Sequence, residues 1–353
     1  MPELSPMAKK LKVRPKPPTP KEEIAGDVKQ TPAVHIEEEP AAKPEKKGLP
    51  GVNISALIAQ VAEQEPEPEA LCLFLLGTRQ AGKSTTLGTA SGTMFLFTTS
   101  DEAHSIETAN AMASSSHGVT IVPVIIDMLT EDERGKPLLR KEWKALTPDQ
   151  AITKLNGMID ALEADADISQ KVQWIGLDSL YSIFKKINQK KNIQQIKTVA
   201  KNTFRAQEVA LNELLALNQK LLLLQKRGVN VVVTCPAAAE QDKNTGLYDQ
   251  VEPLLEGYRN NLHVVGIFPD ICTVGVAVIE DNEGETHSGH FFQFGGDLNK
   301  AGKRVSGQER CINFKPRING ILSNETPDFM NADLTELSEY KRMVRESRKT
   351  KGE

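Results

Sequence analysis

A glycine-rich motif directly after an apolar run constrains this 353-residue chain more than any other feature. The run is Leu71–Leu76, and the residues that follow, Gly77–Thr85, fit the pattern G-x-x-x-x-G-K-[ST] without a gap. A helix-compatible segment comes next, so the motif stands between a strand and a helix, as a P-loop (Walker A motif) does. The motif therefore predicts an α/β fold built around this strand.

The residue types in the motif are those that binding a nucleoside triphosphate requires. Gly77 and Gly82 allow the backbone to curl so that successive N–H groups face phosphate oxygens. We expect Lys83 to reach the β- and γ-phosphates and the Ser84 hydroxyl to ligate Mg²⁺. The predicted cofactors are ATP and Mg²⁺, although the motif does not distinguish ATP from GTP. The predicted binding residues are Gly77, Thr78, Arg79, Gln80, Ala81, Gly82, Lys83, Ser84 and Thr85.

Strand-like and helix-like segments alternate along the middle of the chain. Several of the strand-like segments are almost continuous runs of Val, Ile, Leu and Phe, which is typical of strands covered on both faces. The alternation predicts a mostly parallel sheet flanked by helices and joined by right-handed crossovers. The expected strands are Leu71–Leu76, Thr93–Phe97, Thr120–Ile126, Val172–Leu177 and Val229–Cys235, and the clearest helices are Pro148–Glu163 and residues 198–227.

The two ends of the chain have a different character. Residues 1–48 are rich in Pro, Lys and Glu, which predicts a disordered tail, and residues 53–64 have helical spacing. Toward the C-terminus, shorter strands predict a β-meander at the sheet edge, followed by a polar helix and a basic tail. The segments expected there are Ile271–Ile279, His290–Phe294, Arg310–Phe314 and the helix at 332–348. The predicted division is 1–48 (tail), 49–325 (P-loop domain, with a β-extension at 262–320) and 326–353 (C-terminal helix and tail).

Polar side chains that end or follow other apolar runs are expected to lie beside the loop Gly77–Thr85 and to complete the site. Asp178 follows one such run, where a carboxylate would hold the metal, through water. Asp101 and Glu102 follow another, and a carboxylate there could act as the general base for the attacking water. Glu102 is the preferred base, Asp101 stays open, and an acidic helix cap is the alternative. Thr234 ends a third run and either senses the γ-phosphate or simply ends its strand.

A strongly basic segment follows Asp178. Between Tyr181 and Arg205 the chain has seven Lys or Arg residues and no acid. Such a cluster gains affinity for nucleic acid by releasing counterions, and Phe184 and Phe204 could stack on bases. The alternative is a solvated helix face, although such faces commonly carry paired acids. The basic residues are Lys185, Lys186, Lys190, Lys191, Lys197, Lys201 and Arg205.

In their order these motifs resemble the RecA-like P-loop ATPases, in particular compact phage-encoded proteins associated with single-strand annealing. The resemblance covers residues 70–320 and includes Gly77–Thr85, the strand ending at Glu102, Leu177–Leu180 and Arg227–Thr234. It implies that Glu102 is the catalytic glutamate, that Thr234 is a polar sensor, and that residues 236–250 contact DNA. By analogy it also implies a homo-oligomer. Lys303, Arg304, Arg310, Lys315 or Arg317 could then supply a finger to the γ-phosphate of a neighbouring subunit, and Arg317 is the preferred residue.

Charge, cysteines and hydropathy bear on partners and compartment. The net charge of −4 gives no overall signature of a nucleic-acid binder. The single cysteines Cys72, Cys235, Cys272 and Cys311 favour reduced thiols. No apolar run approaches the ~20 residues that span a bilayer, and the first twenty residues lack a signal-peptide core. We therefore expect no membrane contact and a cytoplasmic location, in the host bacterium if the chain is phage-encoded.

The leading hypothesis is a RecA-like ATPase that acts on single-stranded DNA in phage recombination, annealing or replication. One alternative is a kinase-like P-loop enzyme, whose acceptor pocket would lie within residues 236–320. Another is an assembly protein with little turnover, which would keep the nucleotide site for folding and dock a protein partner through its N-terminal tail. The oligomer size, the DNA polarity and the partner of the tail do not follow from the sequence.

Overall fold

The computed structural model describes residues 70–132, 135–241, 248–255, 264, 266–280, 286–294, 317–321, 327 and 329–351. By its contacts the chain divides into two units, Met1–Gln64 and Glu65–Glu353, and all described residues belong to the second. The predicted disordered tail, the expected helix at 53–64 and the expected strand Arg310–Phe314 lie outside the described residues. Among those described, no helix is both long and apolar enough to span a membrane.

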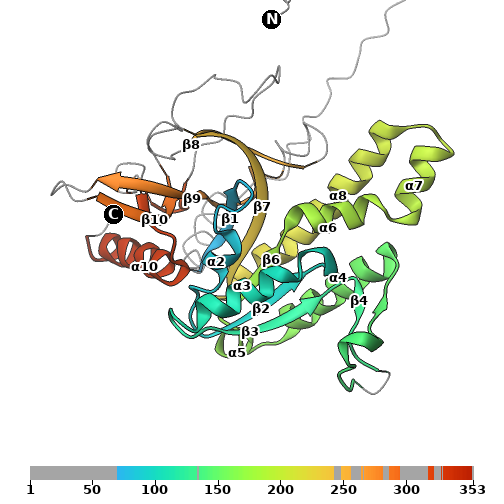
Figure 1. Ribbon diagram of the computed structural model, residues 1–353, viewed down its shortest axis with the longest axis horizontal. Coiled ribbons are helices and arrows are strands. Elements are labelled where there is room, and N and C mark those ends of the chain that lie inside the picture. The colour runs from blue at the N-terminus through green and yellow to red at the C-terminus, as the bar shows by residue number, and fades with distance from the viewer. Residues whose placement is uncertain are drawn as a thin grey trace, which may run out of the picture. The chain divides into compact units, whose positions relative to one another are not determined.

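Nine of the described strands form a mixed sheet in the order β11-β10-β9-β1-β7-β6-β2-β3, with β8 paired to β7 off this path (Figure 1). Two further short strands, β4 (Met128–Leu129) and β5 (Lys144–Ala145), pair antiparallel in a sheet of their own. The six strands from β9 to β3 run parallel to one another. The prediction of a mostly parallel α/β sheet is thus confirmed. The strands are β1 (Cys72–Gly77), β2 (Thr93–Thr98), β3 (Thr120–Ile125), β6 (Trp174–Asp178), β7 (Asn230–Gln241), β8 (Tyr248–Pro253), β9 (Asp270–Glu280), β10 (Thr286–Gln293) and β11 (Phe329–Asn331).

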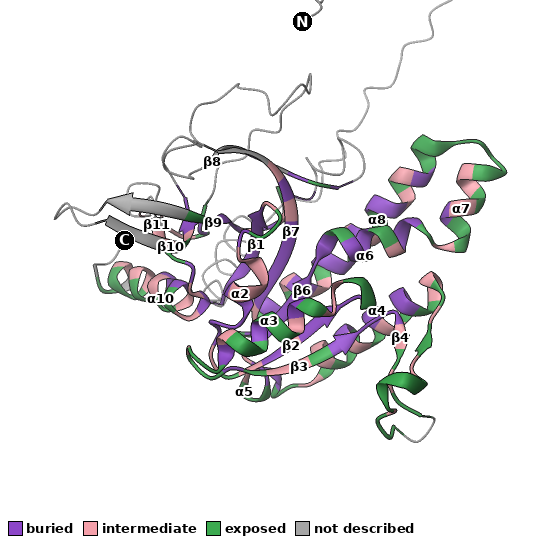
Figure 2. Cartoon of the chain, viewed as in Figure 1, coloured by how far each residue is buried: buried purple, intermediate pink, exposed green. Residues whose placement is uncertain are grey.

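Helices cover both faces of this sheet because its central strand is apolar on both faces. Cys72, Phe74 and Leu76 of β1 pack with α4, α6 and α8, whereas Leu73 and Leu75 pack with α2, α3 and α10. Every residue of β1 is buried, as Figure 2 shows. The α-helices are α2 (Lys83–Leu87), α3 (His104–Ala113), α4 (Pro148–Ala164), α5 (Ile168–Lys171), α6 (Leu180–Asn188), α7 (Lys191–Thr198), α8 (Thr203–Lys226) and α10 (Leu334–Lys351).

Two predictions about the C-terminal half need correction. The expected meander is partly present, but β9 pairs in parallel with β1 and so belongs to the main sheet, while β10 and β11 extend it antiparallel. The third strand, β11, lies beyond the predicted limit at residue 320. The expected DNA-contacting loop 236–250 is mostly a hairpin, in which the end of β7 pairs antiparallel with β8.

The long helix expected at residues 198–227 begins five residues later than predicted. The helix α7 ends at Thr198, and Lys201 then adopts a positive φ of 50°. The Asn202 side chain accepts a hydrogen bond from the Arg205 N–H at 3.0 Å, which caps the first turn of α8. Asparagine is a favoured N-cap residue, so this boundary has a local cause in the sequence.

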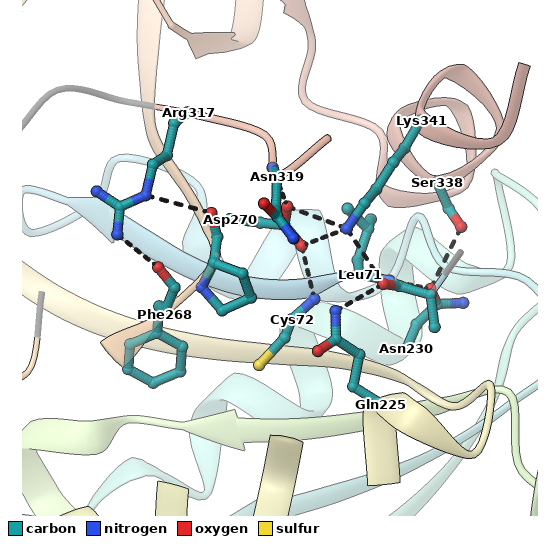
Figure 3. Close-up of polar contacts among 12 residues, drawn as sticks. Leu71, Cys72, Gln225, Asn230, Phe268, Asp270, Arg317, Asn319, Ser338 and Lys341 are labelled. Atoms are coloured by element: carbon teal, nitrogen blue, oxygen red, sulfur yellow. Dashed lines mark hydrogen bonds and ion pairs between the residues drawn. The ribbon is translucent and has the colours of Figure 1, made fainter. Parts of the chain in front are cut away.

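A buried polar cluster fastens α10 to the amino end of the sheet (Figure 3). Lys341 Nζ lies 2.8 Å from Asp270 Oδ2, and both side chains are 0% exposed. Asp270 also accepts hydrogen bonds from the N–H groups of Cys72 and Asn319, at 2.8 and 2.7 Å. Lys341 donates in addition to the Ala70 carbonyl at 3.2 Å. This cluster therefore joins β1, β9 and α10, on the opposite edge of the sheet from the P-loop.

Candidate nucleotide-binding site

The loop after β1 is shaped by positive-φ residues and by close contact with β9 and β10. Gln80 and Gly82 have φ values of 67° and 91°, and glycine adopts such a conformation without strain. A Cβ on Gly77 would lie 2.8 Å from the Val274 carbonyl oxygen, and one on Gly82 would lie 2.3 Å from His290 Nδ1. Both motif glycines are therefore required by the packing of β9 and β10 against the loop.

Lys83, the first residue of α2, folds back over this loop. Its Nζ donates to the carbonyl oxygens of Gly77 and Thr78, at 2.9 and 2.8 Å. Burial lowers the pKa of Lys83, and the carboxylates of Asp178 and Glu102 oppose that shift. Since α2 has only five residues, its dipole is short, and the positive charge at the loop comes from the Lys83 ammonium together with the exposed Arg79.

Asp178 joins the loop to two neighbouring strands. It ends β6, is 3% exposed, and its Oδ2 accepts a hydrogen bond from Ser84 Oγ at 3.2 Å. Its Oδ1 accepts one from Thr234 Oγ1. Burial raises the pKa of Asp178, while the hydrogen bond from Thr234 lowers it. The predicted grouping of Ser84, Asp178 and Thr234 is thus present, because parallel pairing aligns the carboxyl ends of β1, β7 and β6.

Glu102 also lies at this edge of the sheet. It follows β2, which pairs with β6 so that Thr98 is level with Asp178. Its Oε1 accepts hydrogen bonds from Ser182 Oγ at 2.9 Å and from Ser179 Oγ at 3.4 Å. The carboxylate raises the pKa of Lys83 and of Asp178, so it lies within electrostatic reach of both. Asp101 is exposed and makes no hydrogen bond to these groups among the described residues, which favours Glu102 as the base.

One further hydroxyl near Asp178, that of Ser105 on α3, was not anticipated from the sequence. Ser105 is 1% exposed, and its hydroxyl lies close enough to the Asp178 carboxylate to lower the pKa of Asp178, against the larger effect of burial. No sequence pattern marks this residue, since a serine after a strand is common.

The donor set at this edge fits a magnesium ion. Carboxylate and hydroxyl oxygens are the hard ligands that Mg²⁺ prefers, and it commonly uses one or two carboxylates together with substrate phosphates and water. Ser84, Asp178 and the nearby Ser105 hydroxyl match that demand. The described residues contain no group of three or more His, Cys, Asp or Glu side chains that could hold a metal without phosphate.

His290 of β10 is a second unanticipated neighbour of the loop. Its Nδ1 lies 3.3 Å from the Ala81 carbonyl oxygen. The contact joins residues 209 positions apart, and no local pattern predicts it. The β9–β10 hairpin thus packs against one side of the loop Gly77–Thr85.

Arg317 is not part of this site. Its backbone pairs with Ile271, and its guanidinium donates to the carbonyl oxygens of Phe268 at 2.7 Å and Pro269 at 3.3 Å (Figure 3). These contacts lie at the beginning of β9, on the opposite edge of the sheet from the P-loop. Within its own chain Arg317 therefore fixes the beginning of β9, and its predicted action on a neighbouring subunit stays a prediction.

The basic segment divides into paired and exposed residues. Lys186 Nζ lies 2.7 Å from Asp127 Oδ2 and Lys190 Nζ 2.9 Å from Glu213 Oε2, so acids from other elements pair with these two residues. Phe184 is a core residue at 1% exposure, and the prediction that it stacks on bases is wrong. The remaining basic residues, of which all but the half-buried Lys197 are exposed, are Lys185, Lys191, Lys197, Lys201 and Arg205.

Cys72, Cys235 and Cys272 are buried free thiols, as expected, and Cys311 lies outside the described residues. Burial raises the pKa of Cys235 to about 12, which keeps this thiol protonated beside the site.

A comparison of the chain with known protein families and with curated proteins found no match. Function is therefore inferred from the geometry of the site.

Replacing Asp178 by Asn should stabilise the nucleotide-free fold, because Asn carries no charge for burial to disfavour. A raised pKa means that the folded wild type binds more protons than the unfolded chain above the ordinary aspartate value of about 3.9. Wild-type stability should therefore fall relative to Asp178→Asn as the pH rises through the raised pKa. Urea unfolding of both proteins without Mg²⁺, from about pH 4 to about pH 8, measures this difference. A difference that does not change with pH would contradict it.

Proposed function

We propose that this chain is a RecA-like P-loop ATPase, which binds ATP with Mg²⁺ at Gly77–Thr85 and hydrolyses it. The proposal is supported chiefly by one observation, the convergence of five predicted side chains at the carboxyl edge of the sheet. They come from segments far apart in the sequence, and each is of the chemical type that phosphate transfer to water uses. These side chains are Lys83, Ser84, Glu102, Asp178 and Thr234.

The loop N–H groups and Lys83 would bind the phosphates, with Lys83 exchanging its two carbonyl contacts for phosphate oxygens. Ser84 and Asp178 would hold Mg²⁺, which supplies charge neutralisation on the phosphates when bound. Glu102 would orient the attacking water and accept its proton. Thr234 would hold the Asp178 carboxylate beside Ser84 through its hydrogen bond to Asp178. Thr234 would therefore sense the γ-phosphate through Asp178.

Single-stranded DNA is the partner that we propose for the exposed part of the basic segment, here called the arm tip (residues 197–205). Val199 and Phe204 are 80% and 56% exposed there, and Figure 2 shows this turn between α7 and α8 as exposed. Lys201 and Arg205 lie beside them without an acid between residues 191 and 207. Apolar side chains beside exposed cations suit a strand that offers both bases and phosphates.

Steady-state hydrolysis of ATP, with and without a single-stranded oligonucleotide, tests both parts of the proposal. Lys83→Ala serves as the blank. We expect DNA to stimulate turnover, and the double variant Lys201→Glu/Arg205→Glu to lose that stimulation while it keeps basal turnover. Lys226→Glu, at the other end of α8, is the matched control and should behave as wild type. Turnover that ignores DNA would favour the kinase-like alternative, and bound ATP without turnover would favour the assembly protein.

A further inference from the structure

Helix α6 is linked to the segment Ser100–Glu102 directly through Ser182 and indirectly, through Asp127, by Lys186. Ser182 Oγ donates to Glu102 Oε1 at 2.9 Å, and Lys186 Nζ lies 2.7 Å from Asp127 Oδ2. Residues four apart lie on the same face of a helix, so one face of α6 carries both side chains. Ser182 contacts the single turn Ser100–Glu102 that follows β2, whereas Lys186 contacts Asp127 beside that turn.

Asp127 transmits the second contact to that segment. Its Oδ1 accepts a hydrogen bond from the Ser100 N–H at 2.7 Å, and its Oδ2 accepts one from Ser100 Oγ at 2.9 Å. Burial alone would raise the pKa of Asp127, but the hydrogen bonds from Lys186 and Ser100 lower it below the ordinary value. The carboxylate is therefore charged, and charge-assisted hydrogen bonds of this kind are about twice as strong as neutral ones. Ser100 is fixed through Asp127, and Glu102 is fixed directly by Ser182.

We propose that Ser182 and Lys186 are positioning residues, which hold Glu102 where it orients the attacking water. This inference rests on the proposed hydrolysis. Neither side chain needs to touch the nucleotide, because both act through the Glu102 segment. Glu102 Oε1 accepts the hydrogen bonds from Ser182 and Ser179. No hydrogen bond among the described residues reaches Oε2, so this oxygen would accept the proton of the attacking water.

The size of the effect follows from how closely a base must be placed. A displacement of about 1 Å can cost about 100-fold in rate, because the base must stay within hydrogen-bond reach of the water. Removal of the Ser182 hydroxyl should therefore lower kcat by about 10- to 100-fold. The KM for ATP should not change, since Lys83 and the loop are untouched.

The test is steady-state kinetics on Ser182→Ala and Lys186→Met, with Lys185→Met as the control on the exposed neighbouring residue. Ser182→Thr keeps the hydroxyl and should recover most of the lost kcat. Lys186→Met leaves Asp127 buried without its cation and could unfold the protein. The stability of Lys186→Met is therefore measured by urea unfolding. If Lys186→Met does not fold, the test rests on Ser182→Ala.

The double variant Glu102→Gln/Ser182→Ala separates positioning from a general structural effect. If Ser182 acts through Glu102, the second substitution should cause no further loss. An equal further loss would overturn the inference, and so would an unchanged kcat in Ser182→Ala. A raised kcat would also overturn it, by showing that the hydrogen bond holds Glu102 away from the water. Wild-type protein that binds Mg·ATP without turnover would overturn the hydrolysis proposal itself, which distinguishes the two failures.

Discussion

Replacing Lys341 by Met should destabilise the fold by about 3–5 kcal/mol, because the substitution leaves the Asp270 carboxylate buried without its cation. Both side chains are 0% exposed, so water cannot replace the lost partner. The ammonium also satisfies the Ala70 carbonyl before β1, and that contact would be lost as well. Urea unfolding gives the change in the free energy of unfolding directly.

The neighbouring residue on α10 provides a matched control. Arg342 pairs with Glu346 at 3.1 Å, but these side chains are 52% and 51% exposed. Arg342→Met should therefore change the free energy of unfolding by no more than about 0.5 kcal/mol. A comparable loss in the two variants, or a loss below about 1 kcal/mol in Lys341→Met, would show that the buried pair does not fasten α10 to the sheet.

Glu102→Gln should lower ATP turnover by about 10²- to 10⁴-fold while ATP binding is retained. The amide has nearly the same shape and can still accept hydrogen bonds from Ser182 and Ser179, but it cannot take a proton from water. Single-turnover hydrolysis and equilibrium binding of ATP, measured on the same protein, separate the two effects.

Asp101→Asn is the control, since Asp101 is the adjacent acid and is exposed. It should hydrolyse ATP at nearly the wild-type rate. An equal loss in both variants would assign the effect to the segment and not to one carboxylate, and an unaffected Glu102→Gln would exclude Glu102 as the base.

The sequence predicted those parts of the molecule that are determined locally. The apolar runs gave β1, β2, β3 and β6 to within about two residues, because strands buried on both faces leave a strong local signal. The loop Gly77–Thr85 and Asp178, which ends β6, could be placed for the same reason. The later start of α8 was also predictable, since asparagine is a favoured N-cap residue and the Asn202 side chain accepts a hydrogen bond from the N–H of Arg205, three positions on.

Pairing between distant segments could not be predicted. Lys186 and Lys190 were assigned to a nucleic-acid surface because no acid is near them in sequence, yet Asp127 and Glu213 reach them in the fold. The buried Lys341 in an otherwise polar helix is a similar case, since its partner lies 71 residues away. Charge patterns along the chain therefore identify the basic segment, but only the fold separates its structural lysines from its exposed ones.

The central claim is that Gly77–Thr85 binds ATP with Mg²⁺, and calorimetric titration of ATP into wild-type protein and Lys83→Ala tests it most directly. We expect wild-type protein to bind one ATP per chain, more weakly when Mg²⁺ is chelated. Lys83→Ala should lose at least about tenfold in affinity, or about 1.4 kcal/mol, because it lacks the ammonium that would bind the β- and γ-phosphates. Equal affinity in the two proteins, or no binding by the wild type, would contradict the claim.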